Sequence, residues 1–303
     1  MNLHGVIAAA ATPVTSTWQI DNDHLIEHCR WLLGPGGCDG INLLGTTGEA
    51  SSFSVAQRLG AMEAVAKAGL PLDRFMVGTG AAALGDTCML TSAARDLDFA
   101  GALVIPPFYY KSIGQEGLLA YFRALIETIG CDGLRLYLYN FPAMSAVPYD
   151  LQSVVGLRSA YPEQILGLKD SSGDLDYAAA VAKSLPGFLV FPSAEGSLAT
   201  ATEMGFAGCI SATANVTGPA AGRAWRSDNA DEKSTALKLA TEMRKAITRF
   251  PLVASVKAAL SIIQKDTNWL RLVPPLTGLS PGDADELSGR LQDFNLRDNE
   301  QHT

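Results

Sequence analysis

The chain has 303 residues, of which 48% are hydrophobic, so it can bury the core of one barrel-sized domain or of two smaller ones. A net charge of -8 and a pI of about 5.0, with 23 scattered basic residues, argue against nucleic acid as a partner. Five cysteines without CxxC spacing are typical of reduced thiols, rather than of a disulfide framework or a zinc site.

The first apolar stretch, GVIAAAATPV at residues 5–14, resembles the core of a signal peptide but lacks a basic segment before it. We therefore interpret it as the first strand of the fold. No stretch of the chain reaches the length of a membrane span, so we expect a soluble, cytoplasmic protein without a membrane partner.

Eight short apolar stretches alternate with helical patterns along the chain. They lie at residues 5–13, 40–45, 75–80, 102–107, 134–142, 165–170, 188–193 and 208–213. Nearly continuous hydrophobicity is typical of parallel strands that are buried on both faces. The segments between them, such as 54–69 and 114–130, have helical periodicity, and several begin with a Ser, Asp or Gly-rich start signal.

Eight strand–helix units in about 225 residues predict an α/β fold of the (β/α)8 TIM-barrel type. An open doubly wound sheet is the alternative, but it would normally carry a glycine-rich phosphate motif after its first strand, where this chain reads ATPVTSTW. The pattern after Asn229 is helical throughout. We therefore expect a catalytic barrel domain over residues 1–229 and a C-terminal helical region over residues 230–303.

Lys169 ends the sixth predicted strand, in GLKDSSGD at residues 167–174. Active sites of this fold lie at the C-terminal ends of the strands, so polar side chains there are the candidates. A lysine at such a position can simply extend into water. Alternatively it is a desolvated amine that forms a Schiff base with a carbonyl substrate, because burial disfavours the ammonium ion.

Tyr139 ends the fifth strand, in YLYNFP, and favours the second interpretation of Lys169. Adjacent parallel strands lie about 5 Å apart, so the two side chains can meet over the barrel mouth. Tyr137 alternates with Tyr139, so both side chains point to the same face. A phenol near a Schiff base can carry a proton to or from a substrate hydroxyl.

Two other strand ends carry polar groups. The loop GTTGE at residues 45–49 offers two hydroxyls and accessible backbone N–H groups, which suit a small carboxylate, although a plain turn is the alternative. The segment PPFYYK at residues 106–111 exposes Tyr109 and Tyr110 as site or interface residues.

The histidines form no cluster with carboxylates. His24 and His28 lie four residues apart on the first predicted helix without a pattern such as HExxH, so we predict solvated or lightly packed side chains and no metal site. No GxSxG segment indicates a serine hydrolase.

Four motifs at the ends of the second, fourth, fifth and sixth strands resemble the dihydrodipicolinate synthase / N-acetylneuraminate lyase superfamily: GTTGE, PPFYY, YNFP and GLKDSSGD. Its members are class I, Schiff-base aldolases and lyases that act on 2-oxo acids. The resemblance extends to AGCISATANV at residues 207–216 and to the helical C-terminal region, so it covers nearly the whole chain. It implies a carbon–carbon lyase without cofactor or metal, with pyruvate and an aldehyde as partners.

The resemblance also implies roles for single residues. Lys169 matches the Schiff-base lysine, and Tyr139 matches the tyrosine that moves protons at the reacting bond. Thr46 and Thr47 match the pair that binds the carboxylate of the 2-oxo acid and the tyrosine hydroxyl.

Two further roles concern the rim of the site and a neighbouring subunit. Tyr109 matches the tyrosine that a neighbouring subunit lends, with Tyr110 as the alternative. The backbone of Ile210 matches a position that lines the site. Family members are commonly homotetramers built as dimers of tight dimers, which the sharing of Tyr109 would require.

Met144 departs from the pattern of the synthases. There the fifth-strand motif continues with an arginine that holds the carboxylate of the aldehyde substrate, and a thioether cannot replace that bidentate grip. The sequence therefore favours a 2-keto-3-deoxy sugar acid aldolase with an uncharged or hydroxylated aldehyde. A 4-hydroxy-2-oxoglutarate aldolase and a 2-oxo acid dehydratase stay as alternatives, ahead of dihydrodipicolinate synthase, a non-catalytic 2-oxo acid-binding homologue and a metal-dependent barrel enzyme.

Overall fold

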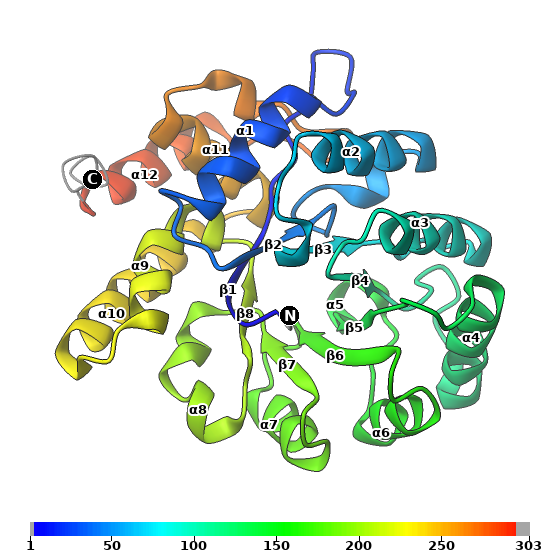
Figure 1. Ribbon diagram of the computed structural model, residues 1–303. Helices are drawn as coiled ribbons and strands as arrows, with labels where there is room; N and C mark the ends of the chain where they lie inside the picture. The colour runs from blue at the N-terminus through cyan, green and yellow to red at the C-terminus, as the bar shows by residue number, and fades with distance from the viewer. Residues whose placement is uncertain (1–2, 295–303) are drawn as a thin grey trace.

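A computed structural model describes residues 3–294, and within them eight parallel strands curve into a nearly closed barrel (Figure 1). The strands are β1 Gly5–Ala9, β2 Gly40–Leu43, β3 Phe75–Gly78, β4 Gly101–Val104, β5 Leu136–Asn140, β6 Ile165–Asp170, β7 Leu189–Pro192 and β8 Gly208–Ser211. β8 pairs with β1, and each further strand pairs with the next up to β7. Where β7 and β8 face each other, Ala207 N–H donates to Val190 O at 2.9 Å. The predicted TIM barrel is confirmed.

Helices alternate with the strands and surround the barrel in Figure 1. They are α1 Asn22–Leu33, α2 Val55–Lys67, α3 Leu84–Asp96, α4 Gly114–Ile129, α5 Pro142–Ser145, α6 Leu151–Ala160, α7 Leu175–Ser184, α8 Ala201–Met204 and α9 Ala214–Arg226. Side chains at their starts satisfy backbone N–H groups that lack partners within the helix. Asp21 caps α1, Ser54 and Gln57 form a reciprocal capping box on α2, and Asp174 of GLKDSSGD caps α7.

The strands separate two apolar layers. Residues such as Ile41 and Leu43 of β2 belong to the larger layer, which packs under the helices. The barrel interior is filled by Leu3, Ile7, Ala9, Met76, Ala100, Leu103, Tyr137, Tyr139, Leu189, Phe191, Ala207 and Ile210. Both strand faces are therefore buried, which explains the nearly continuous hydrophobicity of the strand sequences.

Tyr137 closes the barrel interior below the C-terminal ends of the strands. Its side chain is 1% exposed, and its ring lies against Gly101 of β4 and Gly167 of β6. A Cβ atom on these glycines would lie 2.6 Å and 2.8 Å from ring carbons of Tyr137, which close packing does not allow. Gly167, the glycine of GLKD, therefore leaves room for the ring of Tyr137. Burial raises the pKa of Tyr137 to about 12.

Three helices and a short turn follow the barrel. They are α10 Ala230–Ile247, α11 Leu252–Gln264, the 3-10 turn η4 Thr267–Leu270 and α12 Pro281–Gln292. α10 packs along α9 (Figure 1), and α11 and α12 share an apolar cluster with Ala11 and Ala212 of the barrel. Within the region expected to be helical throughout, residues 271–280 carry no helix, and residues 295–303 lie outside the described part. The domain boundary at residue 229 stays a prediction.

No single helix within residues 3–294 is long and apolar enough to cross a membrane. Only α10 and α11 together meet the criteria of length and composition, and the pair is bent by 115°. Both helices bury apolar side chains within the protein, including Ala240 and Met243 of α10 and Val256 of α11.

Candidate active site

Lys169 and Tyr139 lie against each other inside the barrel. Tyr139 of β5 is the direct register partner of Lys169 of β6, which in turn pairs with Phe191 of β7. The Lys169 Nζ atom lies 4.4 Å from the centre of the Tyr139 ring. Each residue is only 4% exposed, so the lysine does not extend into bulk water. The expected contact between the two strand ends is confirmed.

Buried polar residues on the outer side of β5 and β6 hold this arrangement. Asn140 follows Tyr139, and Asp170 follows Lys169, so both point away from the barrel interior. Asn140 Nδ2 donates to Asp170 Oδ1 at 2.7 Å, and the Ser172 hydroxyl donates to Asp170 Oδ2 at 2.7 Å. Burial raises the pKa of Asp170, while these two hydrogen bonds oppose the rise. The sequence reasoning did not identify this network, although the polar residue after each inward side chain was a signal for it.

The GTTGE loop approaches Tyr139 from the end of β2. Thr46 Oγ1 lies 3.3 Å from the Tyr139 phenol oxygen, within hydrogen-bond distance, and Thr47 is 5% exposed. The Thr12 hydroxyl donates to Gly48 O at 2.8 Å and fixes the loop to the segment after β1. Strands β2, β5 and β6 therefore bring a hydroxyl, a phenol and an amine together at one end of the barrel.

Left-handed residues flank the two threonines. Leu44 has φ 53° and Glu49 has φ 55°, values that are uncommon for residues other than glycine. Such a backbone costs on the order of 1–3 kcal/mol per residue and persists only where the surroundings hold it. The Glu49 carboxylate meets Lys257 Nζ and the Val273 N–H, both from the C-terminal region. These contacts hold the loop in its conformation.

Asn42 is a polar residue of the barrel interior that the sequence reasoning missed. It is fully buried on β2 and pairs with Ala9 and Met76, which both face the interior. Its amide nitrogen lies 2.4 Å from the position of a Cβ atom on Gly45, so a side chain at residue 45 would displace it. Neither amide atom of Asn42 has a hydrogen-bond partner among residues 3–294. Because buried amides are normally paired, Asn42 is a candidate contact for water or substrate below the threonine loop.

The other expected site residues, Ile210, Tyr109 and Tyr110, differ in whether they lie inside the barrel or at the surface. Ile210 of β8 is fully buried in the barrel interior, in register with Ile7 of β1. Tyr109 and Tyr110 follow β4 and are 73% and 71% exposed, with their ring centres 5.3 Å apart. One chain alone therefore does not enclose these two tyrosines together with Lys169.

His28 is not solvated, and the prediction made for it is wrong. It is 2% exposed, and its Nε2 lies 2.9 Å from Asn215 Oδ1. Its ring contacts those of Trp31 and Trp269. Burial lowers the pKa of His28 to about 4. His24 is half-buried, with Nε2 3.5 Å from Asp266 Oδ2.

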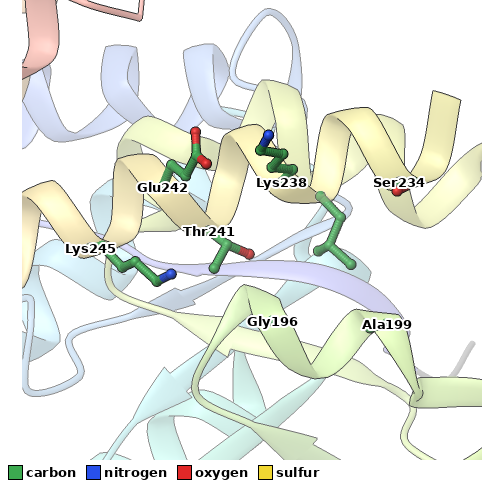
Figure 2. A pocket seen from close by; sticks show the side chains of 8 residues that line it. Gly196, Ala199, Ser234, Lys238, Thr241, Glu242 and Lys245 are labelled. Carbon is green, nitrogen blue, oxygen red and sulfur yellow. The ribbon is translucent and has the colours of Figure 1, made fainter. Parts of the chain in front are cut away.

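A groove on the outside of the barrel is separate from these residues (Figure 2). It lies between the 3-10 turn η3 Glu195–Ala199 and α10. Its lining consists of Gly196, Ala199, Ser234, Leu237, Lys238, Thr241, Glu242 and Lys245. None of these side chains comes from the strand ends that carry Lys169 and Tyr139, so the groove is not part of the candidate active site.

Comparisons with known proteins agree with the fold. The profile of the dihydrodipicolinate synthetase family matches residues 2–293. An uncharacterized DapA-like lyase of Chloroflexus aurantiacus is 40% identical over 209 residues, 69% of each chain. An N-acetylneuraminate lyase of Salmonella paratyphi B is 30% identical over 216 residues, 71% of each chain. The crystal structure of dihydrodipicolinate synthase from Agrobacterium tumefaciens has a TM-score of 0.88 at 27% identity and covers 96% of this chain and 99% of that one.

Proposed function

The chain belongs to the dihydrodipicolinate synthetase family and is a carbon–carbon lyase, and on this premise we propose that it acts through a Schiff base at Lys169. Its substrate is a 2-oxo acid that it cleaves or forms, with pyruvate as one partner. The observation that carries the proposal is the buried amine of Lys169 against the Tyr139 ring. An amine enclosed in this way, next to a phenol, suits attack on a carbonyl carbon.

Binding and imine formation use the threonine loop and the lysine. The carboxylate of the 2-oxo acid docks at the hydroxyls and backbone N–H groups of Thr46 and Thr47. The Lys169 amine then attacks carbon C2 of the ketone. Loss of one water molecule from the resulting carbinolamine leaves an iminium ion that links Lys169 to the substrate.

Cleavage uses the iminium as an acceptor of electrons. The electron pair of the C3–C4 bond moves into the iminium and forms an enamine. Tyr139, which gives its proton to the water that leaves the carbinolamine, takes the proton of the C4 hydroxyl as the aldehyde forms. Protonation of the enamine at C3 restores the iminium. Addition of water then releases pyruvate and the free Lys169 amine. The reverse sequence forms the C3–C4 bond.

Met144 supports a substrate whose aldehyde part carries no carboxylate. It lies on α5, just after the strand that carries Tyr139, and it is 59% exposed. Its thioether is a weak acceptor and cannot bind an anion as a guanidinium does. A 2-keto-3-deoxy sugar acid fits this constraint. A 4-hydroxy-2-oxoglutarate aldolase, a 2-oxo acid dehydratase and dihydrodipicolinate synthase are the alternatives.

We also propose a homotetramer in which Tyr109 reaches the site of a neighbouring subunit, with Tyr110 as the alternative. The exposure of both tyrosines in one chain supports this arrangement, because large aromatic side chains are enriched at subunit interfaces. A monomeric mass for the active enzyme in sedimentation would contradict the proposal.

Trapping with borohydride tests the chemistry directly. Incubation with pyruvate and borohydride should add a reduced pyruvyl group to the peptide that contains Lys169, as read by mass spectrometry. Lys169→Met should form no adduct. Tyr139→Phe should still form the adduct but cleave substrate about 10²–10⁴-fold more slowly, because it lacks the proton carrier.

Two results would sink separate parts of the proposal. Folded wild-type protein without an adduct at Lys169 would exclude the Schiff base. An adduct without pyruvate release from any member of a panel of 2-keto-3-deoxy acids would instead favour a non-catalytic 2-oxo acid-binding protein.

A further inference from the structure

A buried ion pair joins the threonine loop to the C-terminal helices. Glu49 ends the GTTGE loop, and Lys257 lies on α11, 208 positions further along the chain. Both side chains are fully buried, and Lys257 Nζ donates to Glu49 Oε1. Nζ also donates to Arg271 O at 2.7 Å, and Val273 N–H donates to Glu49 Oε2 at 2.8 Å. One carboxylate therefore receives hydrogen bonds from two segments of the C-terminal region.

Backbone hydrogen bonds connect Glu49 to the threonines. Glu49 N–H donates to Thr46 O at 3.1 Å, and Ala50 N–H donates to Gly45 O at 3.2 Å. The loop is thus a closed turn whose last residue is anchored by its side chain. Because Thr46 Oγ1 lies 3.3 Å from the Tyr139 phenol, a displacement of Glu49 would move the hydroxyl that faces Tyr139.

Stability alone does not account for this pair. Removing two charges from water can cost more than their attraction returns, so a buried ion pair is a poor means of stabilising a fold. Burial lowers the pKa of Lys257, and the charge and hydrogen bond of Glu49 oppose that effect. The ion pair lies where Glu49 has a left-handed backbone, so its side-chain contacts anchor that end of the loop.

We propose that Lys257 and Glu49 are positioning residues that set the affinity of the Thr46–Thr47 loop for the carboxylate of the 2-oxo acid. The C-terminal helices therefore take part in substrate binding without contacting the substrate. This inference rests on the proposed function, since it requires a 2-oxo acid at the threonine loop.

Glu49→Gln tests the inference, because glutamine keeps the size and an acceptor oxygen but removes the charge. The pyruvate concentration that gives half-maximal trapping at Lys169 should rise about ten-fold or more, because small displacements of binding groups have large effects. Trapping at saturating pyruvate should stay near the wild-type level. Glu49→Gln/Lys257→Met should also raise this concentration about ten-fold or more relative to wild type, because it lacks the ion pair and the Lys257 contact to Arg271 O. This double variant buries no charge and provides the comparison even if Glu49→Gln fails to fold.

Asp39→Asn is the matched control at the opposite end of the barrel. Asp39 immediately precedes β2, and its carboxylate likewise meets one backbone N–H, from Val6 at 2.8 Å, and one cation, Arg226 at 2.7 Å. This variant should lower the Tm. It should leave the pyruvate concentration for half-maximal trapping within about two-fold of wild type, because Asp39 has no contact with the loop.

The outcomes separate the inference from the proposed function. The inference alone would be overturned if the pyruvate concentration for half-maximal trapping by Glu49→Gln stayed within about two-fold of wild type. An equal rise of that concentration in Asp39→Asn would overturn it as well. Wild-type protein that forms no adduct would overturn the proposed function and this inference with it.

Discussion

Met144 is the residue from which the proposed function infers an aldehyde without a carboxylate. It follows the strand that carries Tyr139 by a few residues and is mostly exposed on the short helix α5. Its neighbour Ala143 is exposed on the same turn. An arginine introduced at either position would therefore place a positive charge in nearly the same region, but pointing in a different direction. The pair therefore allows a specific contact to be distinguished from a general effect of charge.

Met144→Arg should shift the preference of the enzyme toward substrates with a carboxylate on the aldehyde part. The ratio of kcat/KM for 4-hydroxy-2-oxoglutarate to that for a 2-keto-3-deoxy sugar acid should rise about ten-fold or more, because a guanidinium binds a carboxylate bidentately. Steady-state release of pyruvate measures both values. Ala143→Arg should change the ratio less. An equal change in both variants would show that the position of the charge does not matter.

Residues differ in how far the sequence predicts their surroundings. Tyr139 and Lys169 could be placed together because alternation along a strand and the common direction of parallel strands determine where strand-end side chains point. Asn42 was not recognised because its apolar neighbours mask one polar residue within a strand. Lys257 could not be paired with Glu49, because nothing local in either segment encodes a contact across 208 positions.

Among the elements, α1, α9 and η4 meet around His28. Its Nε2 donates to Asn215 of α9, and Trp269 of η4 packs edge-on against its ring. Asn215 also accepts from Ala11 N–H and donates to Ala9 O, so the histidine is tied to the end of β1. Helical periodicity predicted α1, but whether its histidines are buried depends on helices that follow much later in the chain.

His28→Leu should reduce the dependence of stability on pH in the acid range. The pKa of about 4 in the folded protein lies below the ordinary value of 6.5, so the unfolded state binds more protons between these values. The contribution of neutral His28 to the free energy of unfolding is therefore fully present above pH 6.5 and is lost as the pH drops toward 4. The loss amounts to roughly 3 kcal/mol in the free energy of unfolding.

Urea unfolding between about pH 7 and about pH 4 measures this difference. His24→Leu, on the same helix, leaves His28 in place and should keep most of the wild-type dependence, because the charge of His24 is the smallest of the causes that shift the pKa of His28. An unchanged pH dependence in His28→Leu would contradict the assignment to His28.

Across the whole molecule, two buried carboxylates of the barrel region have their cationic partners on the C-terminal helices. Glu49 is paired with Lys257, and the fully buried Glu195 is paired with Arg244 of α10 at 3.1 Å. The division between residues 1–229 and 230–303 marks the end of the strand–helix units in the sequence. The ion pairs cross this division, so it does not separate two independent cores.

A chain that ends at residue 229 is therefore expected not to fold. Loss of Lys257 alone leaves Glu49 buried without its partner, which costs about 3–5 kcal/mol of the roughly 5–15 kcal/mol of a typical protein. The apolar cluster that Ala11 and Ala212 share with α11 and α12 would be lost as well. Soluble yield and circular dichroism of residues 1–229 measure the outcome, with the full chain as the reference. A cooperative unfolding transition in the shortened chain would contradict the expectation.

The ring of Tyr137 determines by which route molecules reach Lys169. Tyr137 and Leu189 lie one inward-facing position closer to the N-terminal ends of the strands and fill the barrel there. Within residues 3–294, these side chains fill the barrel on the N-terminal side of Lys169, which leaves the opposite end as its route to solvent. In the proposed reaction the aldehyde would depart through the opening by which water enters, so a retained aldehyde would delay hydrolysis of the iminium and favour its own re-addition. Escape of the first product would thus determine how often the bound intermediate is hydrolysed rather than returned to the uncleaved substrate.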